Sequence, residues 1–120
     1  MESAARRDPA RREGQPESRH LGLIGGLGVG AAVIYYQEIA AGLADRGAVP
    51  RITIVHAHAP TALAHVTAGR IDELAEYLAG FVAELCRVGT ELIAICAVTP
   101  HIALGPLAKR VSVPIINMLG

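Results

Sequence analysis

Short apolar runs that resemble β-strands alternate along this chain with stretches of helical periodicity. The runs are rich in Val, Ile and Leu and are bounded by glycine, proline or charged residues: 21–25, 51–57, 91–96 and 113–118. Strands that alternate with helices form a parallel sheet with right-handed crossovers, because helices must then cover both faces of the strands. We therefore expect an α/β fold with a four-stranded parallel sheet and helices on both faces.

Two of the intervening segments are predicted to be amphipathic helices. The first follows Gly30, ends at Gly47, and places one apolar set on a single face: Val33, Tyr36, Ala40 and Leu43. The second runs from Arg70 to Gly89 and has a longer inward set: Ile71, Leu74, Ala75, Leu78, Val82 and Leu85. Between the second strand and this helix we expect only a loop around Pro60.

Composition excludes several classes of function. The 11 basic and 11 acidic residues give a formal net charge of +0, so no basic field exists to attract nucleic acid or an anionic membrane. Charged residues or His interrupt every apolar run before it reaches the length of a membrane span. Two cysteines are too few for a disulfide framework, which favours the reducing cytoplasm. Residues 1–20 hold five arginines and four acidic residues, so we expect a disordered tail before one domain at residues 21–120.

The loop after the first strand, Gly25–Gly30, is a candidate anion-binding site. Its glycines let the backbone approach a ligand and direct N–H groups at a negative charge. Residues 26–31 also fit the looser dinucleotide pattern G-x-G-x-x-A, but the second strand ends in His56 and His58 where an acidic residue would hold a ribose. A nucleotide-binding domain and a tight turn without a ligand remain alternatives.

The segment after the third strand, Cys96-Ala97-Val98-Thr99-Pro100-His101, is the second candidate. Thr99 and Pro100 suit the N-cap and first position of a helix, which we expect to be short or broken because Gly105-Pro106 follows. The unpaired N–H groups of that first turn attract anions, and Thr99 can hydrogen-bond a carboxylate. His101 can orient a substrate or donate to its carboxylate. Alternatively, Thr99 only caps the helix and His101 is a partly buried helix residue.

A metal site is a third possibility. His56 and His58 are two residues apart on a strand and so point the same way, and His65 is a conceivable third ligand. No nearby Cys, Asp or Glu completes the set, so we expect no metal and no cofactor. Cys86, inside the second helix, is interpreted as a half-buried core residue.

Three segments together resemble the aspartate/glutamate racemase family, which works without pyridoxal phosphate. Residues 23–28 are similar to the family's I-G-G-M-G opening, residues 89–101 to its G-A-D-x-I-x-x-x-C-N-T-x-H segment, and residues 113–118 to the strand that follows. The resemblance covers residues 20–120. It implies the flavodoxin-like N-terminal half of a two-domain isomerase.

The resemblance also implies a site and a mechanism. Family members have two similar halves with the active site between them, and a thiol from each half faces the substrate α-carbon. One thiolate removes the α-proton, and the other thiol delivers a proton to the opposite face. The implied substrate is a small acidic amino acid or related carboxylate, and the residues implied to bind it are Gly26, Gly28, Thr99 and His101.

The chain departs from the family pattern in two ways. The family's first cysteine aligns with Ala97 and its asparagine with Val98. Cys96, the candidate catalytic base, lies one residue earlier, and one step along a strand turns a side chain to the opposite face, so we expect it to point into the sheet. The chain also stops at Gly120, before a second half. We therefore expect a truncated half, inactive alone and prone to homo-oligomerise through its exposed apolar surface, or else a non-catalytic carboxylate-binding or assembly module.

Overall fold

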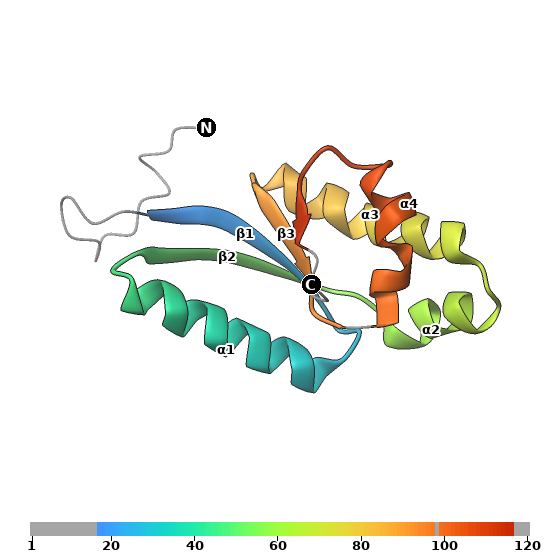
Figure 1. Ribbon diagram of the computed structural model, residues 1–120, viewed down its shortest axis with the longest axis horizontal. Coiled ribbons are helices and arrows are strands. Elements are labelled where there is room, and N and C mark those ends of the chain that lie inside the picture. Colours follow the sequence, from blue (N-terminus) through green and yellow to red (C-terminus); the bar gives the residue numbers. More distant parts are fainter. Residues whose placement is uncertain (1–16, 98, 117–120) are drawn as a thin grey trace.

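The computed structural model of the chain describes residues 17–97 and 99–116 (Figure 1). Residues 1–16 of the predicted tail, Val98 and residues 117–120 lie outside this part. The elements follow one another in this order: β1 (Glu17–Gly25), α1 (Val29–Asp45), β2 (Val49–His56), α2 (Ala59–Thr67), α3 (Ile71–Arg87), β3 (Leu92–Ile95), the 3-10 helix η2 (Thr99–Ala103), α4 (Leu104–Ala108) and β4 (Ile115–Ile116).

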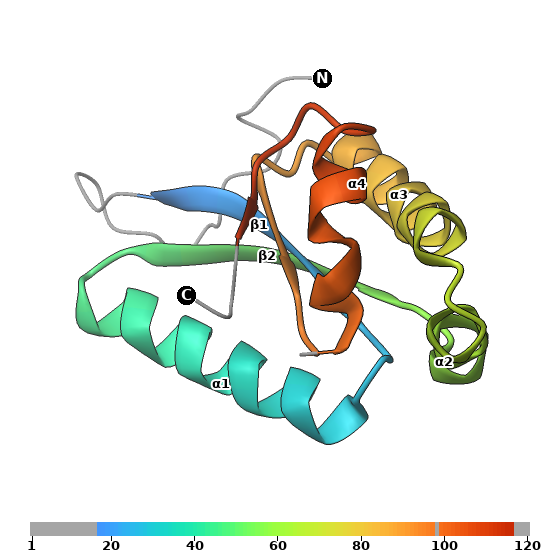
Figure 2. The ribbon, with the colours of Figure 1, turned by 45° about the vertical axis from the view of Figure 1, so that its right-hand side comes forward.

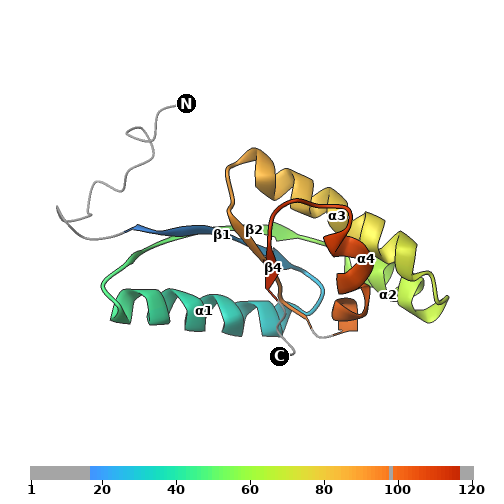
Figure 3. The same cartoon turned by 45° about the horizontal axis from the view of Figure 1, so that its top comes forward.

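The four strands form one sheet in the order β2-β1-β3-β4, and every neighbouring pair is parallel. Helix α1 lies on one face, and α3 and α4 lie on the other with α2 beside α3 (Figures 2 and 3). The predicted four-stranded parallel α/β fold is confirmed. Because all strands point the same way, the loops that follow them gather at one edge of the sheet.

Two apolar clusters hold the layers together. The larger lies between the sheet and α3, α2 and α4, and its fully buried side chains are Ile24, Leu74, Ala75, Leu78, Leu85, Ile93, Ile95, Ala103 and Leu107. The smaller lies under α1 and contains Leu21, Leu23, Ala94 and Cys96. Neighbouring residues on β1 and β3 enter opposite clusters because strand side chains alternate between faces.

Helix α3 confirms its predicted inward face, whereas α1 does so only in part. Five of the six residues predicted inward on α3 are buried, and Ile71 packs at the edge of the same cluster. On α1 no residue is fully buried; Ala32, Tyr35 and Ile39 face the sheet, while Val33 and Tyr36 are 49% and 45% exposed. Ala40 and Leu43 of the expected face are half-buried, so the prediction for α1 was wrong only at Val33 and Tyr36. The helix is apolar on nearly every side, so periodicity could not distinguish the face that packs.

Strand β1 begins at Glu17, inside the segment expected to be disordered. His20 is buried there, and its Nε2 lies 2.7 Å from the hydroxyl oxygen of Thr53 on β2. The His20 N–H donates to the Glu91 carboxylate at 2.8 Å. These partners extend the sheet beyond the apolar run, which polar residue types alone did not indicate.

The loop expected around Pro60 is instead helix α2. Pro60 lies in its first turn, where a missing N–H costs no hydrogen bond, and Ala62 is buried against α3. The entry to the helix is held by His58, whose Nδ1 lies 2.8 Å from the Thr61 hydroxyl and whose N–H donates to the Tyr77 hydroxyl at 2.9 Å. The expectation of a loop was therefore wrong, because proline is compatible with the first turn of a helix.

The C-terminal elements are short. Helices η2 and α4 have five residues each and follow one another directly, which confirms the predicted short or broken helix. Strand β4 covers only Ile115–Ile116 of the predicted 113–118, and residues 117–118 lie outside the described part. Within residues 17–97 and 99–116, no helix combines the length and apolarity that a membrane span requires.

Candidate functional site

The two predicted ligand-binding segments leave the sheet side by side. They follow the paired strands β1 and β3, and the Cys96 N–H donates to the Ile24 carbonyl at 3.0 Å where both strands end. Leu27 of the glycine loop and Pro100 of η2 line the same cavity, of about 180 Å³. The structure therefore brings the glycine loop and the start of η2 together at the carboxyl edge of the sheet.

The glycine loop is held against the end of β2. Gly26 has φ +84°, and a Cβ at this position would overlap the carbonyl oxygen of Ala57. The Ala57 N–H donates to the Gly25 carbonyl at 2.8 Å, which fixes the bend. Gly28 is the N-cap residue of α1, and no side-chain hydrogen bond caps this end of the helix. No acidic residue lies in the first turn of α1. The unpaired N–H groups of that turn thus face no negative charge from α1 itself.

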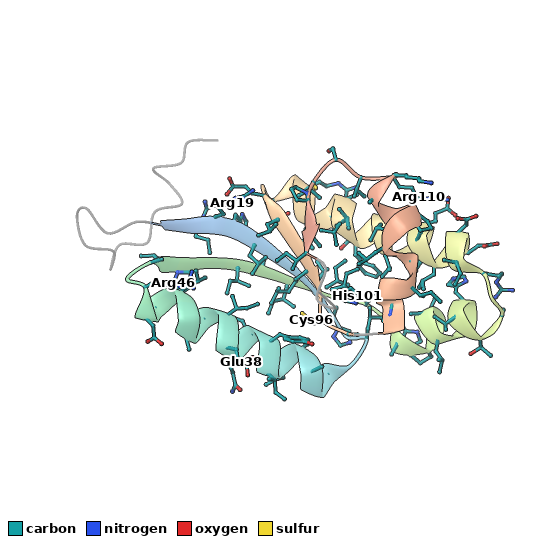
Figure 4. All side chains as sticks on the ribbon, in the orientation of Figure 1. Arg19, Glu38, Arg46, Cys96, His101 and Arg110 are labelled. Atoms are coloured by element: carbon teal, nitrogen blue, oxygen red, sulfur yellow. The ribbon has the colours of Figure 1, made fainter. Side chains whose placement is uncertain are left out.

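Cys96 is fully buried in the cluster under α1, as its strand position predicted (Figure 4). Burial raises the pKa of its thiol from 9.0 to about 11, because the apolar surroundings disfavour the thiolate. Ala97, the position that aligns with the family cysteine, is partly exposed but has no ionisable group. The described part of this segment therefore offers no accessible thiolate.

His101 is 5% exposed, and its Nδ1 lies 2.7 Å from the carbonyl oxygen of Ala97. A carbonyl only accepts, so Nδ1 carries a proton and donates it. This hydrogen bond holds η2 against the end of β3. His101 therefore fits the alternative stated above, a buried helix residue. Thr99 is the first residue of η2, but its side chain lies outside the described part.

The three histidines considered as metal ligands occupy different structural positions. His56 ends β2 and is exposed beside Gly26, whereas His58 is bonded to Thr61 at the start of α2. His65 lies on α2 with its ring centroid 6.1 Å from that of Tyr77. Among the described residues, no three His, Cys, Asp or Glu side chains lie close enough together to hold a metal ion.

A second cavity, of about 200 Å³, opens on the other side of the glycine loop between α1 and β2. Gly25, Gly26 and His56 line its inner end, and apolar side chains of α1 and Ile54 of β2 line the rest. Sequence reasoning missed this cavity. The position of His56 at the end of a strand was visible in the sequence. However, Val33 and Tyr36, which line the cavity from α1, were expected on the apolar face of that helix.

A parallel sheet with a glycine loop and a short helix at its carboxyl edge defines an α/β domain of the class in which ligands bind at the carboxyl ends of the strands. The sequence profile of the Asp/Glu/Hydantoin racemase family matches residues 24–120, and the chain belongs to this family.

Solved structures agree with that assignment. A proposed Asp/Glu racemase from Yersinia pestis superimposes with a TM-score of 0.75 at 23% identity, over 82% of this chain and 44% of that one. An aspartate racemase homologue from Pyrococcus horikoshii superimposes with a TM-score of 0.62 at 26% identity, again over 82% and 44%. The chain thus spans less than half the length of these proteins. A search of curated protein sequences found no match of significant similarity.

Proposed function

We propose that this chain is the substrate-binding half of a cofactor-independent amino-acid racemase. It holds the α-carboxylate of a small amino acid or related carboxylate between the Gly25–Gly30 loop and residues 99–101. The observation that carries this proposal is the shared cavity of Leu27 and Pro100, which paired strands bring to one edge of the sheet. Gly26, Gly28 and the first turn of α1 supply main-chain donors to the carboxylate.

Different observations support the proposed roles of Thr99 and His101. Thr99 is assigned to the carboxylate from the family motif, since it follows β3 at the matching position. His101 positions η2 through the hydrogen bond from its Nδ1 to the Ala97 carbonyl, and it is proposed to support the site in this way.

Proton transfer at the α-carbon requires a base, and the described part of the candidate site offers no accessible thiol. Position 97 is alanine, and Cys96 is buried with a pKa of about 11. We therefore propose that this half binds and orients the substrate, while a second half supplies the group that exchanges the proton. The same observation favours the second candidate function, a carboxylate-binding module without catalysis.

The chain is proposed to associate with a second half or another copy through the rim of this edge. Leu63 on α2 and Ile102 on η2 are 60% and 57% exposed, and their burial against a partner would favour association. Light scattering coupled to size exclusion measures the association, and a monomer at every concentration would contradict self-association. Cys86 and Cys96 are both free, which fits the proposed cytoplasmic location.

Binding is tested by titrating aspartate and glutamate into ¹⁵N-labelled chain. We expect the amide signals of residues 25–30 and 99–101 to shift, and Thr99→Val to weaken binding about tenfold, the value of one hydrogen bond to a charged group. Thr67→Val, on the exposed end of α2, is the matched control. Shifts confined to other regions, or none, would reject the proposed site. Stabilisation by NAD without stabilisation by either amino acid would favour nucleotide binding instead.

Catalysis is tested by following exchange of the α-hydrogen of aspartate and glutamate in deuterated water. We expect no exchange by the wild-type chain or by Cys96→Ala, and exchange once the chain is extended by, or mixed with, a second half from a relative. Exchange by the wild-type chain that Cys96→Ala abolishes would identify Cys96 as the base and refute this division of roles.

A further inference from the structure

We propose that Tyr77 of α3 is a positioning residue of the candidate site. Its hydroxyl fixes the segment Ala57-His58 between β2 and α2, and thereby sets the position of both walls of the cavity shared by Leu27 and Pro100. This inference rests on the proposed function, because it names the residue that controls how well that cavity holds its ligand. Tyr77 is not among the residues predicted to face inward on α3, so helical periodicity did not indicate this role.

The hydroxyl of Tyr77 contacts both polar main-chain groups of His58. The His58 N–H donates to the hydroxyl oxygen at 2.9 Å, and the hydroxyl donates to the His58 carbonyl over a longer distance of 3.5 Å. The same carbonyl accepts the first hydrogen bonds of α2, from the N–H groups of Thr61 and Ala62. Tyr77 therefore holds the residue from which α2 starts.

The ring of Tyr77 is itself held in place, so its hydroxyl has a defined position. It packs edge-on against Phe81, one turn further along α3, with 5.1 Å between the ring centroids, and its centroid lies 6.1 Å from that of His65 on α2. It also packs against the larger apolar cluster. These contacts do not involve the hydroxyl, so Tyr77→Phe removes one hydrogen-bonding group and leaves the ring packing unchanged.

The segment held by Tyr77 also holds the glycine loop. Ala57, directly before His58, is buried, and its N–H donates to the Gly25 carbonyl at 2.8 Å. Its own carbonyl leaves no room for a Cβ on Gly26. Because adjacent residues share a planar peptide group, a shift of His58 moves Ala57 with it. The position of the glycine loop, one wall of the cavity, thus depends on the same hydroxyl.

Helix α2 forms the other wall. The residues that line it lie on one face of the helix, at spacings of three and four: Ala59, Ala62, Leu63 and Val66. Among the helices and strands, α2 packs mainly on α3 (Figure 1), and Ala62 is the only buried residue of its nine. An element with few buried contacts is easily displaced. The hydrogen bond to Tyr77 is therefore a large share of what keeps this wall in place.

The test titrates aspartate and glutamate into the wild-type chain and into Tyr77→Phe, with NMR detection, at a temperature where both chains are fully folded. Loss of one neutral hydrogen bond corresponds to a factor of about three to ten, so we expect the dissociation constant to rise by that factor. Tyr35→Phe is the matched control. It removes the same hydroxyl from a tyrosine of α1, which packs on the opposite face of the sheet, and should leave the dissociation constant unchanged.

Amide hydrogen exchange provides a second readout, which a merely structural role would not change. Bound amino acid should slow the exchange of the amides of residues 62–66 in the wild-type chain, because a ligand between the walls favours α2 in its present position. In Tyr77→Phe the same amides should exchange faster than in the wild type, while those of α3 keep their rates.

Three results would overturn the role of Tyr77. One is a lower urea midpoint of Tyr77→Phe with unchanged affinity of the folded chain, which would make the residue structural only. Another is equal weakening by Tyr77→Phe and Tyr35→Phe, and the third is exchange on α2 that bound amino acid does not alter. Failure of the wild-type chain to bind either amino acid would instead refute the proposed function, and the role of Tyr77 in it.

Discussion

Alkylation by iodoacetamide distinguishes the two cysteines of this chain. Cys86 is exposed on α3, so the expectation of a half-buried core residue was wrong; Leu85 is the buried residue at that end of the helix. Cys96 is fully buried under α1, and its pKa is raised from 9.0 to about 11. The thiolate is the form that reacts. At pH 8, a pKa of about 11 leaves about one-thousandth of the Cys96 thiol ionised, against roughly one-tenth at its ordinary value of 9.0, so the shift alone slows Cys96 about 100-fold. Burial slows it further because the reagent must reach the sulfur.

The measurement is peptide mass spectrometry over a time course, with Cys86 as the internal reference. We expect Cys96 to be labelled at least 100-fold more slowly than Cys86 in the folded chain, and the two rates to converge in concentrated urea, where both thiols are exposed. Labelling of Cys96 within tenfold of the Cys86 rate without unfolding would refute the burial and its effect on the pKa. It would also restore Cys96 as a candidate base.

Three further predictions concern stability, measured by urea unfolding. Because the folded-state pKa of Cys96 lies above 9.0, the protonated thiol should contribute fully to the free energy of unfolding below pH 9. This contribution should be lost between pH 9 and 11, by up to about 3 kcal/mol. A Cys96→Ala chain whose stability has the same pH profile would contradict this. Gly26→Ala should cost about 1–3 kcal/mol or more, because φ is +84° and the Cβ meets Ala57, whereas Gly30→Ala, with open space around it, should cost nothing and stabilise α1 by about 1 kcal/mol. Equal effects of these two changes would show that the bend is not strained. Leu78→Ala should cost about 2–5 kcal/mol, because Leu78 is fully buried under the sheet; a loss below about 1 kcal/mol would place it outside the core.

Helix α3 and the strands were predictable because their patterns are strong and local. On α3 the apolar residues occupy one face and charged residues the other, so only one face can be buried. On β1 and β3 the apolar runs indicated a sheet covered on both faces, and the alternation with helices indicated parallel strands. The same logic placed the glycine loop and the start of η2 at one edge, because parallel strands end together.

The sequence by itself therefore determined the fold class, the edge that carries the candidate site, and the direction in which Cys96 points. Only the tertiary structure decided which side of α1 packs, that Pro60 begins a helix, and that His56 lies against Gly26 beside an open apolar cavity. Each of these depends on contacts between residues far apart in the chain, and an element that is apolar on several sides carries no local signal of which side it will bury. The raised pKa of Cys96 has the same origin, since it arises from the packing of α1 over strands β1 and β3.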